Sequence, residues 1–512
     1  MIEQLPDLCA KRAALAPDRV ALEEAATGRS LSYAALDDRA ARVASLLQAR
    51  GIGEGDRVAI LCRNRIAFFE ILFGCAKLGA ILVPFNWRMP PPELDQLAQD
   101  SEPALLFYEG RDAGAASAMK RAPPAIGLDE DYEALIDAAA PGRFRAHWPA
   151  DGVWYLLYTS GTTGRPKGVI YTFRMALANY VNIRSAVDLR AGDSTPNFLP
   201  LFHTAGINLH SLPTLFAGGR VIILEEFDAE ALVALLEARR LDTFFAVPAV
   251  YQALLDHPRF AAAPLGAVRH WGCGGAPLPD AMVDRYRALG IRVCNGMGMT
   301  ETGPTAFLAD PADAWDRIGS VGKPQLLCSV RIVDEAGRDV EGEAVGDLLF
   351  GGPGVTPGYW RNPEATRAAF TDDGWLRSGD LARRDADGFY YVAGRRKEMF
   401  ISGGENVYPA EVENVLCAHP AVSEVAVVAM PDSRWGEVGR AFILPIKGVA
   451  ALDGGELEAF CRERLAAYKV PRRFDMVTDF PRTAAGKIQK HLLAELGGPL
   501  LEEGAKRFGG LG

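Results

Sequence analysis

Tyr158-Thr159-Ser160-Gly161-Thr162-Thr163-Gly164-Arg165-Pro166-Lys167-Gly168 follows an apolar run, residues 153–157, that predicts a buried strand. Hydroxyls and backbone N–H groups donate to phosphate oxygens, glycines let a backbone approach an anion closely, and a lysine adds a positive charge. The stretch is not a Walker A loop, because Lys167 follows Pro166 where that pattern requires glycine. A flexible linker would need neither the preceding strand nor Pro-Lys-Gly. The composition therefore predicts a phosphate-binding loop.

Length and composition restrict the class of protein. A chain of 512 residues predicts two or more domains, and its net charge of -10 argues against a nucleic-acid partner. The 8 cysteines include no Cys-x-x-Cys pair, which favours free thiols over a disulfide framework or a zinc site. Neither a signal peptide nor an apolar run of the ~18 residues that span a membrane is visible. We therefore expect a cytoplasmic protein without integral membrane contact, and a homodimer is left open.

The order of helix and strand patterns predicts the architecture. Both alternate through residues 33–108 and again through 174–247, which is typical of α/β lobes. Ser32 is expected to cap the first helix and Gly51 to end it. Residues 109–147, rich in alanine, proline and aspartate, are expected to form a surface excursion.

The pattern changes in the last third of the chain. From about Gly319 to Tyr391, short strands and glycine-rich turns predict a small antiparallel β-subdomain. Beyond Gly394 the pattern becomes mixed again. The predicted fold class is therefore α/β: a large N-terminal domain of two α/β lobes plus a small β-subdomain, residues 1–394, and a smaller α+β C-terminal domain, residues 395–512.

Further stretches combine glycine with charged or hydroxyl residues. Thr300 and Glu301 end a glycine-rich strand, where they could hold a phosphate oxygen and a Mg²⁺ ion. Asp380 ends the stretch Trp375-Leu-Arg-Ser-Gly-Asp380 and could accept from both hydroxyls of a ribose. The basic run 395–397 precedes Gly403-Gly404, a pattern that a charged interdomain linker also produces. Lys487, in Pro481-Arg-Thr-Ala-Ala-Gly-Lys487, is on its own more often a solvated charge than a catalytic one.

Together these stretches resemble the motifs of the adenylate-forming superfamily, which includes acyl-CoA and aryl-CoA ligases, luciferases and the adenylation domains of peptide synthetases. The resemblance covers nearly the whole chain and implies an ATP-dependent acid–thiol ligase. In such an enzyme a carboxylate attacks the α-phosphate of MgATP to give acyl-AMP, and the thiol of coenzyme A then takes the acyl group and releases AMP. The implied cofactors are ATP, Mg²⁺ and coenzyme A.

The substrate that the resemblance implies is a small carboxylic acid, either fatty or aryl/arylalkyl. The segment Phe202-His-Thr-Ala-Gly206 lacks the aspartate with which an adenylation domain of a peptide synthetase holds an α-amine. Three alternatives remain open: an acyl-AMP ligase for a carrier protein, a luciferase-like oxygenase, and a nucleotide-binding scaffold without chemistry.

The resemblance also assigns roles to individual residues. Lys487, Thr159, Glu301 and His203 would be catalytic, Glu301 would ligate Mg²⁺, and Lys397 would be the hinge about which a mobile C-terminal domain turns. Met297 departs from the family pattern, which commonly has an aromatic residue there to stack on adenine. The acid would contact Phe198, His203, Gly272 and Gly298. Nucleotide and coenzyme A would contact Thr159, Ser160, Gly161, Thr162, Thr163, Gly164, Lys167, Gly274, Gly275, Ala276, Pro277, Asn295, Gly296, Met297, Gly298, Met299, Thr300, Asp380, Arg395, Gly403, Gly404 and Lys487.

Overall fold

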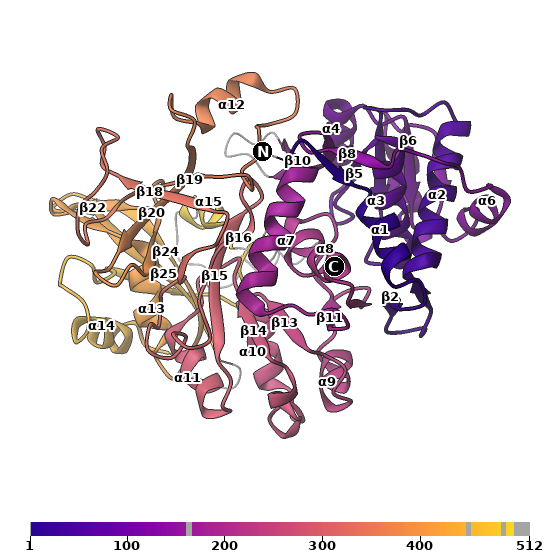
Figure 1. Ribbon diagram of the computed structural model, residues 1–512. Helices are drawn as coiled ribbons and strands as arrows, with labels where there is room; N and C mark the ends of the chain where they lie inside the picture. The colour runs from indigo at the N-terminus through magenta and orange to yellow at the C-terminus, as the bar shows by residue number, and fades with distance from the viewer. Residues whose placement is uncertain (1, 160–165, 447–451, 483–487, 496–512) are drawn as a thin grey trace.

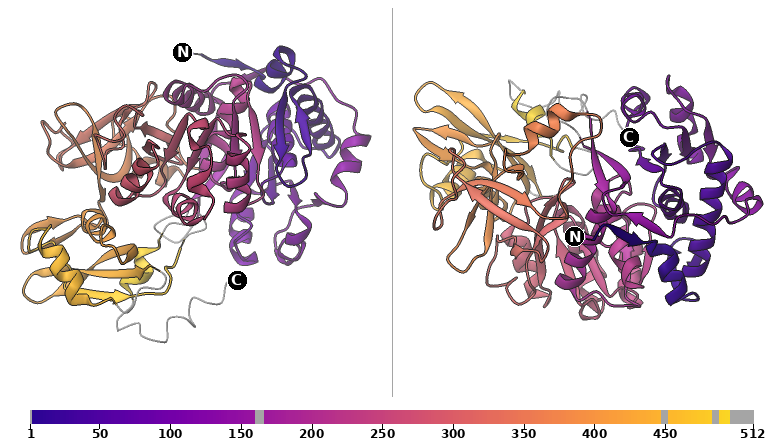
Figure 2. Two further views of the ribbon diagram at one scale, coloured as in Figure 1. Left: turned by 90° about the horizontal axis from the view of Figure 1, so that it is seen from below. Right: turned by 45° about the horizontal axis from the view of Figure 1, so that its top comes forward.

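The computed structural model describes residues 2–159, 166–446, 452–482 and 488–495 (Figure 1). A large N-terminal part carries a smaller C-terminal part, which stands apart from it in the left view of Figure 2. This mixed α/β architecture with two unequal domains confirms the predicted fold class. The predicted site residues that lie outside the described part of the chain are Ser160, Gly161, Thr162, Thr163, Gly164 and Lys487.

The first lobe is built on a six-stranded sheet in the order β10-β9-β5-β4-β6-β7. Its strands are parallel except for the β9–β10 hairpin. Residues of α2 and α3 share a core with one face and residues of α4 share a core with the other, which explains why these strands are apolar throughout. The bounds are Arg57–Leu61 (β4), Ile81–Pro84 (β5), Leu105–Tyr108 (β6), Ala125–Gly127 (β7), Val153–Thr159 (β9), Lys167–Thr172 (β10), Tyr33–Ala49 (α2), Ile66–Leu78 (α3) and Pro91–Ser101 (α4).

The second lobe contains a four-stranded sheet, β11-β12-β2-β3, and a five-stranded sheet, β13-β14-β15-β16-β17. Strands β2 and β3 come from the start of the chain, so the two lobes are not consecutive halves of the sequence. The strands are Val20–Glu24 (β2), Ser30–Ser32 (β3), Ser194–Asn197 (β11), Arg220–Ile223 (β12), Thr243–Ala246 (β13), His270–Cys273 (β14), Val293–Met299 (β15), Gly303–Leu308 (β16) and Lys323–Pro324 (β17). The helices are Phe173–Val187 (α7), Ser211–Ala217 (α8), Ala229–Glu237 (α9), Pro248–Asp256 (α10) and Asp280–Ala288 (α11), while Leu8–Leu15 (α1) packs mainly against α2 of the first lobe.

The expectation of a surface excursion over residues 109–147 is wrong for part of that range. β7 is the edge strand of the first sheet, and the helix Tyr132–Ala138 (α6) packs against α2. Tyr132 is fully buried and its hydroxyl donates to Oε2 of Glu70 at 2.6 Å. Alanine-rich composition therefore concealed a short strand and a short helix that are stabilised by tertiary contacts. Further short elements of this region are Ala113–Ala118 (α5) and His147–Pro149 (β8), which pairs with Gln4–Pro6 (β1).

The last third of the chain forms two further sheets. The predicted β-subdomain is an antiparallel sheet of Ser329–Val333 (β18), Gly346–Gly351 (β19), Leu376–Arg384 (β20) and Tyr390–Arg395 (β21), with Pro363–Ala369 (α12) beside it. The C-terminal domain has a sheet in the order β23-β22-β25-β24, with β26 beside β25. Its elements are Phe400–Ser402 (β22), Glu405–Val407 (β23), Pro409–Cys417 (α13), Val422–Asp432 (β24), Gly436–Pro445 (β25), Gly454–Arg462 (α14), Arg473–Met476 (β26) and Lys490–Ala494 (α15).

Within the described ranges, none of the helices is long and apolar enough to cross a membrane.

Candidate active site

The predicted phosphate loop joins two antiparallel strands of the first lobe. β9 ends at Thr159 and β10 begins at Lys167, and these two residues are directly paired. The hydroxyl of Thr159 donates to the carbonyl of Lys167 at 3.5 Å, a long contact. The hairpin thus fixes both ends of the loop at the edge of the six-stranded sheet.

A segment from much later in the chain completes this edge. Trp360 N–H donates to the carbonyl of Gly168 at 2.7 Å, and Tyr359 bridges to Val169. The ammonium of Lys167 lies 5.1 Å from the ring centroid of Tyr359, within the range of a cation–π contact. Sequence reasoning missed Tyr359, for which Gly358-Tyr359-Trp360 would have been the only local signal.

Tyr359 connects the phosphate loop to the predicted magnesium ligand. Its hydroxyl donates to Oε1 of Glu301 at 2.9 Å, and burial together with the charge of Glu301 raises the pKa of this tyrosine. Glu301 and Thr300 are buried in the turn between β15 and β16. Three segments that are distant in sequence therefore bring Lys167, Tyr359 and Glu301 into one contact chain.

Asp380 and Arg395 also come together. They are paired residues of β20 and β21, and Nε of Arg395 lies 2.7 Å from Oδ1 of Asp380. Asp380 is buried, and its N–H donates to the hydroxyl of Ser378 at 2.9 Å. Asp380 and Arg395, to which the resemblance assigned nucleotide contacts, thus form one ion pair, and Arg395 lies two residues before the predicted hinge, Lys397.

The glycine stretches lie on adjacent strands of the second lobe. A Cβ added to Gly274 would stand 2.9 Å from the carbonyl oxygen of Gly296, so packing excludes a side chain at Gly274, and a Cβ on Gly296 would meet the carbonyl of Phe307 at a tight 3.0 Å. Asn295 holds this strand by donating its amide to the carbonyl of Ser320 at 3.1 Å. Beyond β14 the chain becomes exposed at Gly275, Ala276 and Pro277.

Packing also explains Gly298, because a Cβ there would lie 2.4 Å from the backbone of Pro304 on the facing strand. Met297 and Met299 on either side are partly buried and pack against the core that β16 shares with the β-subdomain. Their contact with adenine stays a prediction.

The residues predicted to contact the acid differ in their surroundings. Phe198 is buried in the core of the second lobe, where its ring contacts those of Phe227 and Phe244. A Cβ on Gly272 would stand 2.3 Å from Cδ2 of Phe245, so the ring of Phe245 occupies the space above this glycine. Phe245 was not among the predicted residues.

His203 lies in a turn rather than at the end of a strand, because β11 already ends at Asn197. The turn leads into a π-helix, Ala205–Leu209, a rare form that is frequent at functional sites. Ala205 N–H donates to Nδ1 of His203 at 3.3 Å. Buried polar groups stabilise the π-helix: the amide of Asn197 donates to the carbonyl of Gly206 at 2.9 Å, and the hydroxyl of Tyr155 donates to Oδ1 of Asn208 at 2.6 Å.

In the C-terminal domain, Gly403 and Gly404 form the turn of the β22–β23 hairpin. Their φ angles of +62° and +89° are those that a two-residue hairpin turn requires of both residues. A Cβ on Gly403 would stand 2.5 Å from Cε3 of Trp435, so the indole lies directly on this turn. The guanidinium carbons of Arg434 and Arg472 lie 5.3 and 5.9 Å from the ring of Trp435.

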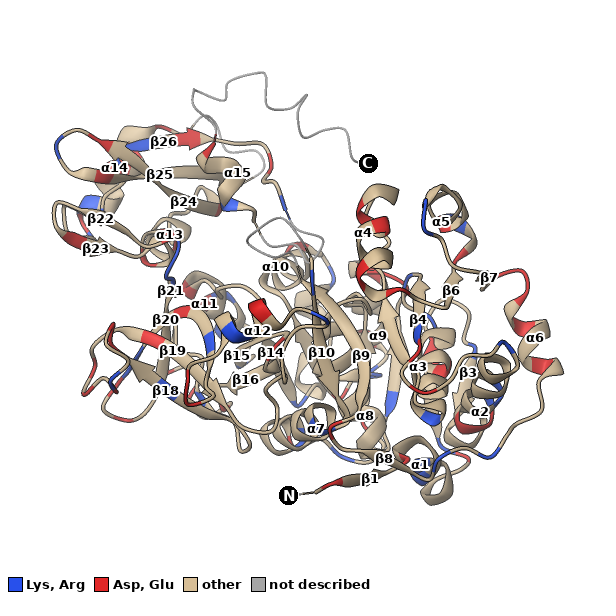
Figure 3. Cartoon of the chain, turned by 90° about the horizontal axis from the view of Figure 1, so that it is seen from above, with Lys and Arg blue, Asp and Glu red and all other residues tan. Residues whose placement is uncertain are grey.

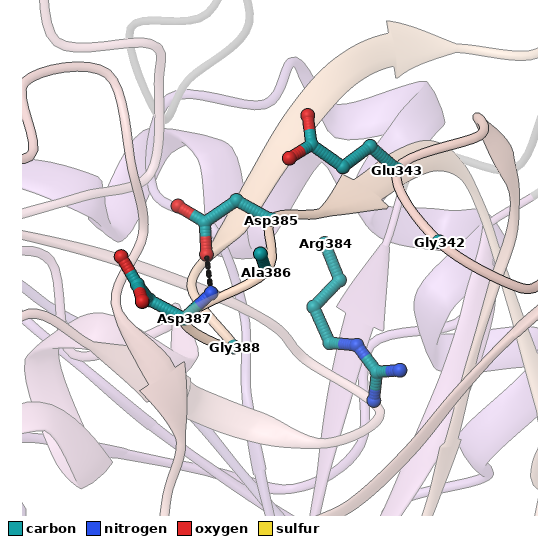
Figure 4. A pocket seen from close by; sticks show the side chains of 7 residues that line it. All are labelled: Gly342, Glu343, Arg384, Asp385, Ala386, Asp387 and Gly388. Carbon is teal, nitrogen blue, oxygen red and sulfur yellow. Dashed lines mark hydrogen bonds between the residues drawn. The ribbon is translucent and has the colours of Figure 1, made fainter.

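A separate hollow of about 400 Å³ lies on the β-subdomain, away from all these residues. Figure 4 shows its lining, in which Asp387 N–H donates to Asp385 at 3.0 Å as part of the β20–β21 turn. The predicted site residues are not part of this lining, and we assign no function to the hollow. Its lining residues are Gly342, Glu343, Arg384, Asp385, Ala386, Asp387 and Gly388.

A hairpin with a predicted phosphate loop, a carboxylate linked to it and a paired Asp–Arg next to a second domain are what we expect of an enzyme that activates its substrate with a nucleotide. The AMP-binding enzyme family model matches residues 9–360, and the model of the AMP-binding enzyme C-terminal domain matches residues 411–487. The chain therefore belongs to the AMP-binding enzyme family. It is an AMP-forming acyl-CoA synthetase, which adenylates a carboxylic acid with ATP and transfers the acyl group to coenzyme A.

Curated relatives cover nearly the whole chain. A feruloyl-CoA synthase of Amycolatopsis sp. is 41% identical over 94% of this chain and 96% of its own length. An indoleacetate–CoA ligase of Aromatoleum aromaticum is 37% identical over 96% of this chain and 98% of its own length. The long-chain-fatty-acid–CoA ligase FadD13 of Mycobacterium tuberculosis is 35% identical over 95% of this chain and 97% of its own length.

Solved structures of one relative differ in their similarity to this chain. ATP-bound MatB of Rhodopseudomonas palustris, 32% identical, has a TM-score of 0.88 over 96% of this chain and 99% of its own. Apo MatB, which is 33% identical over 96% of this chain and 99% of its own, has a TM-score of 0.80. The overall arrangement of this chain is thus more similar to that of the ATP-bound form.

Proposed function

We propose that Lys167, Tyr359 and Glu301 form the phosphate end of the adenylation site, and that Asp380 and Arg395 form its ribose end. The observation on which this rests is the contact chain from Lys167 through Tyr359 to Glu301. This chain joins the cation at the end of the predicted phosphate loop to a hydroxyl and a carboxylate, which supports the proposal. Lys167 would neutralise charge on the phosphates, and the buried Asp380 would accept from the ribose hydroxyls.

The same geometry fits a magnesium ion. Mg²⁺ is usually bound by one or two carboxylates together with phosphate oxygens and water. Glu301 is a buried carboxylate, and the hydrogen bond from Tyr359 to Oε1 orients it. When bound with ATP, the ion would withdraw charge from the phosphates.

We infer that the second step requires the C-terminal domain to turn about Lys397. The neighbours of Lys397 are held by different domains: Arg396 pairs with Asp347 of the β-subdomain at 2.6 and 2.8 Å, and Glu398 pairs with Lys490 of the C-terminal domain at 2.8 Å. The residue between them, Lys397, is therefore our candidate for the point of rotation. The β22–β23 turn lies on the side of the C-terminal domain away from β9 and β10 (Figures 1 and 3), so Gly403 and Gly404 reach the acyl-adenylate only after rotation.

The face of Trp435 is our candidate for the nucleotide end of coenzyme A. An indole ring offers a stacking surface for adenine, and Arg434 and Arg472 beside it would pair with phosphates. Its contact with Gly403 links this face to the turn that we assign to the pantetheine arm.

For the acid, we propose an aryl or arylalkyl carboxylate rather than a long fatty chain. The ring of Phe245 lies along Gly272 and reaches Gly274, whose added Cβ would stand 3.1 Å from Cζ of Phe245. A bulky ring at this position favours a short, flat site and supplies an aromatic face for offset stacking. The feruloyl-CoA and indoleacetate–CoA ligases among the relatives support the same class.

Pyrophosphate release with MgATP, measured across short, long and aromatic acids with and without coenzyme A, tests this proposal. We expect turnover with aromatic acids that depends on coenzyme A, and Phe245→Ala should extend turnover to longer acids. Turnover confined to long-chain acids would contradict the aryl assignment. Pyrophosphate release without any thioester would assign the second step to another acceptor.

Lys487→Ala tests the two-step assignment. A preorganised cation at the developing charge contributes on the order of 10²- to 10³-fold in rate. We expect this variant to lose acyl-AMP formation and to keep thioester formation from supplied acyl-AMP. Equal loss of both steps would contradict rotation between two arrangements. The cytoplasmic location and a homodimer also stay predictions, which fractionation and sedimentation would check.

A further inference from the structure

The two domains are joined by a reciprocal pair of hydrogen bonds away from the hinge. Asp280 is the first residue of α11 in the N-terminal domain, and Asn414 lies in α13 of the C-terminal domain. Asn414 Nδ2 donates to Oδ2 of Asp280 at 3.0 Å, and the N–H of Asp280 donates to Oδ1 of Asn414 at 3.3 Å. Figures 1 and 3 both show α11 and α13 side by side.

The local chemistry makes this contact specific but not tight. The first N–H groups of a helix have no partner within the helix, and the amide oxygen of Asn414 satisfies one of them from the other domain. The other carboxylate oxygen, Oδ1 of Asp280, is buried and has no hydrogen-bond partner among the described residues. A buried carboxylate that lacks one partner holds the domains together less strongly than a fully paired one. A weaker contact of this kind suits a pair of domains that must separate in every turnover.

α13 is also linked to the hinge. Lys490 pairs with Glu413 at 2.7 Å as well as with Glu398 at 2.8 Å, and the pair with Glu413 is largely shielded from solvent. Glu413 directly precedes Asn414 in α13. Rotation about Lys397 therefore moves Glu398, α13 and Asn414 as one body, and it separates Asn414 from Asp280.

We propose that Asp280 and Asn414 are positioning residues that hold the C-terminal domain in the arrangement for adenylation. The greater similarity to ATP-bound than to apo MatB indicates that the contact belongs to an ATP-type arrangement. Release of the contact then accompanies the change to thioester formation. This inference rests on the proposed rotation about Lys397.

The test compares a variant that introduces charge repulsion between the two side chains with a double variant that removes it. Asn414→Asp places two carboxylates against each other, and we expect it to lower ATP–pyrophosphate exchange with acid by about tenfold, the size of a typical coupling between sites. Thioester formation from supplied acyl-AMP should be unchanged or faster. The double variant Asp280→Asn/Asn414→Asp reverses the roles of the two side chains and should restore exchange to near the wild-type rate.

Controls separate this effect from damage to the fold. Asp284→Asn alters another acidic residue of α11, which pairs with Arg287 on the same helix, and should leave both half-reactions unchanged. Asn414→Ala, which removes the contact without repulsion, should shift the half-reactions in the same direction by less. Thermal unfolding of each variant shows whether it is folded.

Two results would overturn the inference: equal loss of both half-reactions in folded Asn414→Asp, or failure of the double variant to restore exchange. Lys487→Ala, measured in parallel, distinguishes the causes. If it separates the two half-reactions while Asn414→Asp does not, the positioning contact is wrong and the rotation stands. If neither variant separates them, the rotation itself is wrong.

Discussion

Tyr359 is the residue that the geometry adds to the proposed adenylation site. Its hydroxyl is bonded to Glu301, and its ring lies next to Lys167. Tyr359→Phe keeps the ring and removes the hydrogen bond. Because a hydrogen bond to a charged group contributes about 1.5–3 kcal/mol, we expect acyl-AMP formation to slow by ~10- to 100-fold. The measurement is ATP–pyrophosphate exchange as a function of Mg²⁺ concentration.

Tyr391→Phe provides a matched control, since its hydroxyl also donates to a partly buried carboxylate, that of Asp385 at 3.2 Å, but in the β-subdomain and outside the proposed site. It should leave exchange unchanged. If Tyr359→Phe exchanged as fast as wild type at every Mg²⁺ concentration, the orientation of Glu301 would not depend on this hydroxyl.

Single residues could be predicted from the sequence where a motif is contiguous. Asp380 and Arg395 were both predicted to contact the nucleotide, which stays a prediction, and the structure adds that they are paired on neighbouring strands. Tyr359 and Phe245 were missed because their roles depend on contacts between distant segments, the bridge to Val169 and the packing on Gly272. Composition around either aromatic residue carries no such information.

Among the elements, the β22–β23 hairpin turn allows a direct test of two adjacent glycines. Both have positive φ, where a non-glycine residue costs roughly 1–2 kcal/mol, but only Gly403 faces the indole of Trp435. Gly404→Ala should lower the free energy of unfolding by that amount, and Gly403→Ala by clearly more. Urea denaturation followed by tryptophan fluorescence measures the difference. Equal losses would mean that Trp435 moves aside without cost.

Element boundaries followed from local chemistry where a cap was present. Ser32 accepts from the N–H of Ala35 at 3.2 Å at the predicted start of α2, and Gly51 has the expected positive φ after its end. β7 and α6 were missed, because an edge strand of three residues depends on pairing with β6 rather than on its own pattern. Likewise, the sequence did not show that β2 and β3, at the start of the chain, belong to the sheet of the second lobe, because this depends on the pairing of β2 with β12.

At the scale of the whole molecule, division into two domains was predicted from the change of pattern near residue 394, whereas their relative orientation was not. Orientation depends on a few contacts between domains, of which Asp280–Asn414 is one. The residues on either side of the predicted hinge, Lys397, pair with different domains: Arg396 pairs with Asp347 of the β-subdomain, and Glu398 pairs with Lys490 of the C-terminal domain. Sequence alone could not show which domain holds which residue.

Stability of the whole protein should fall in mild acid because of two buried histidines of the second lobe. Burial lowers the pKa of His210 to about 3 and that of His270 to about 4, from an ordinary 6.5. The unfolded chain binds protons below 6.5 that the native state does not bind, so the free energy of unfolding decreases as the pH falls from 6.5 towards 4. At pH 5 each histidine should lower the free energy of unfolding by about 2 kcal/mol, since each pH unit below 6.5 costs ~1.4 kcal/mol.

Urea denaturation between pH 5 and 8 should therefore show a shallower pH dependence of the free energy of unfolding for His210→Gln than for wild type, whereas His147→Gln, at an exposed position, should keep the wild-type slope. An unchanged slope in His210→Gln would mean that the native protein already accommodates a proton at this site.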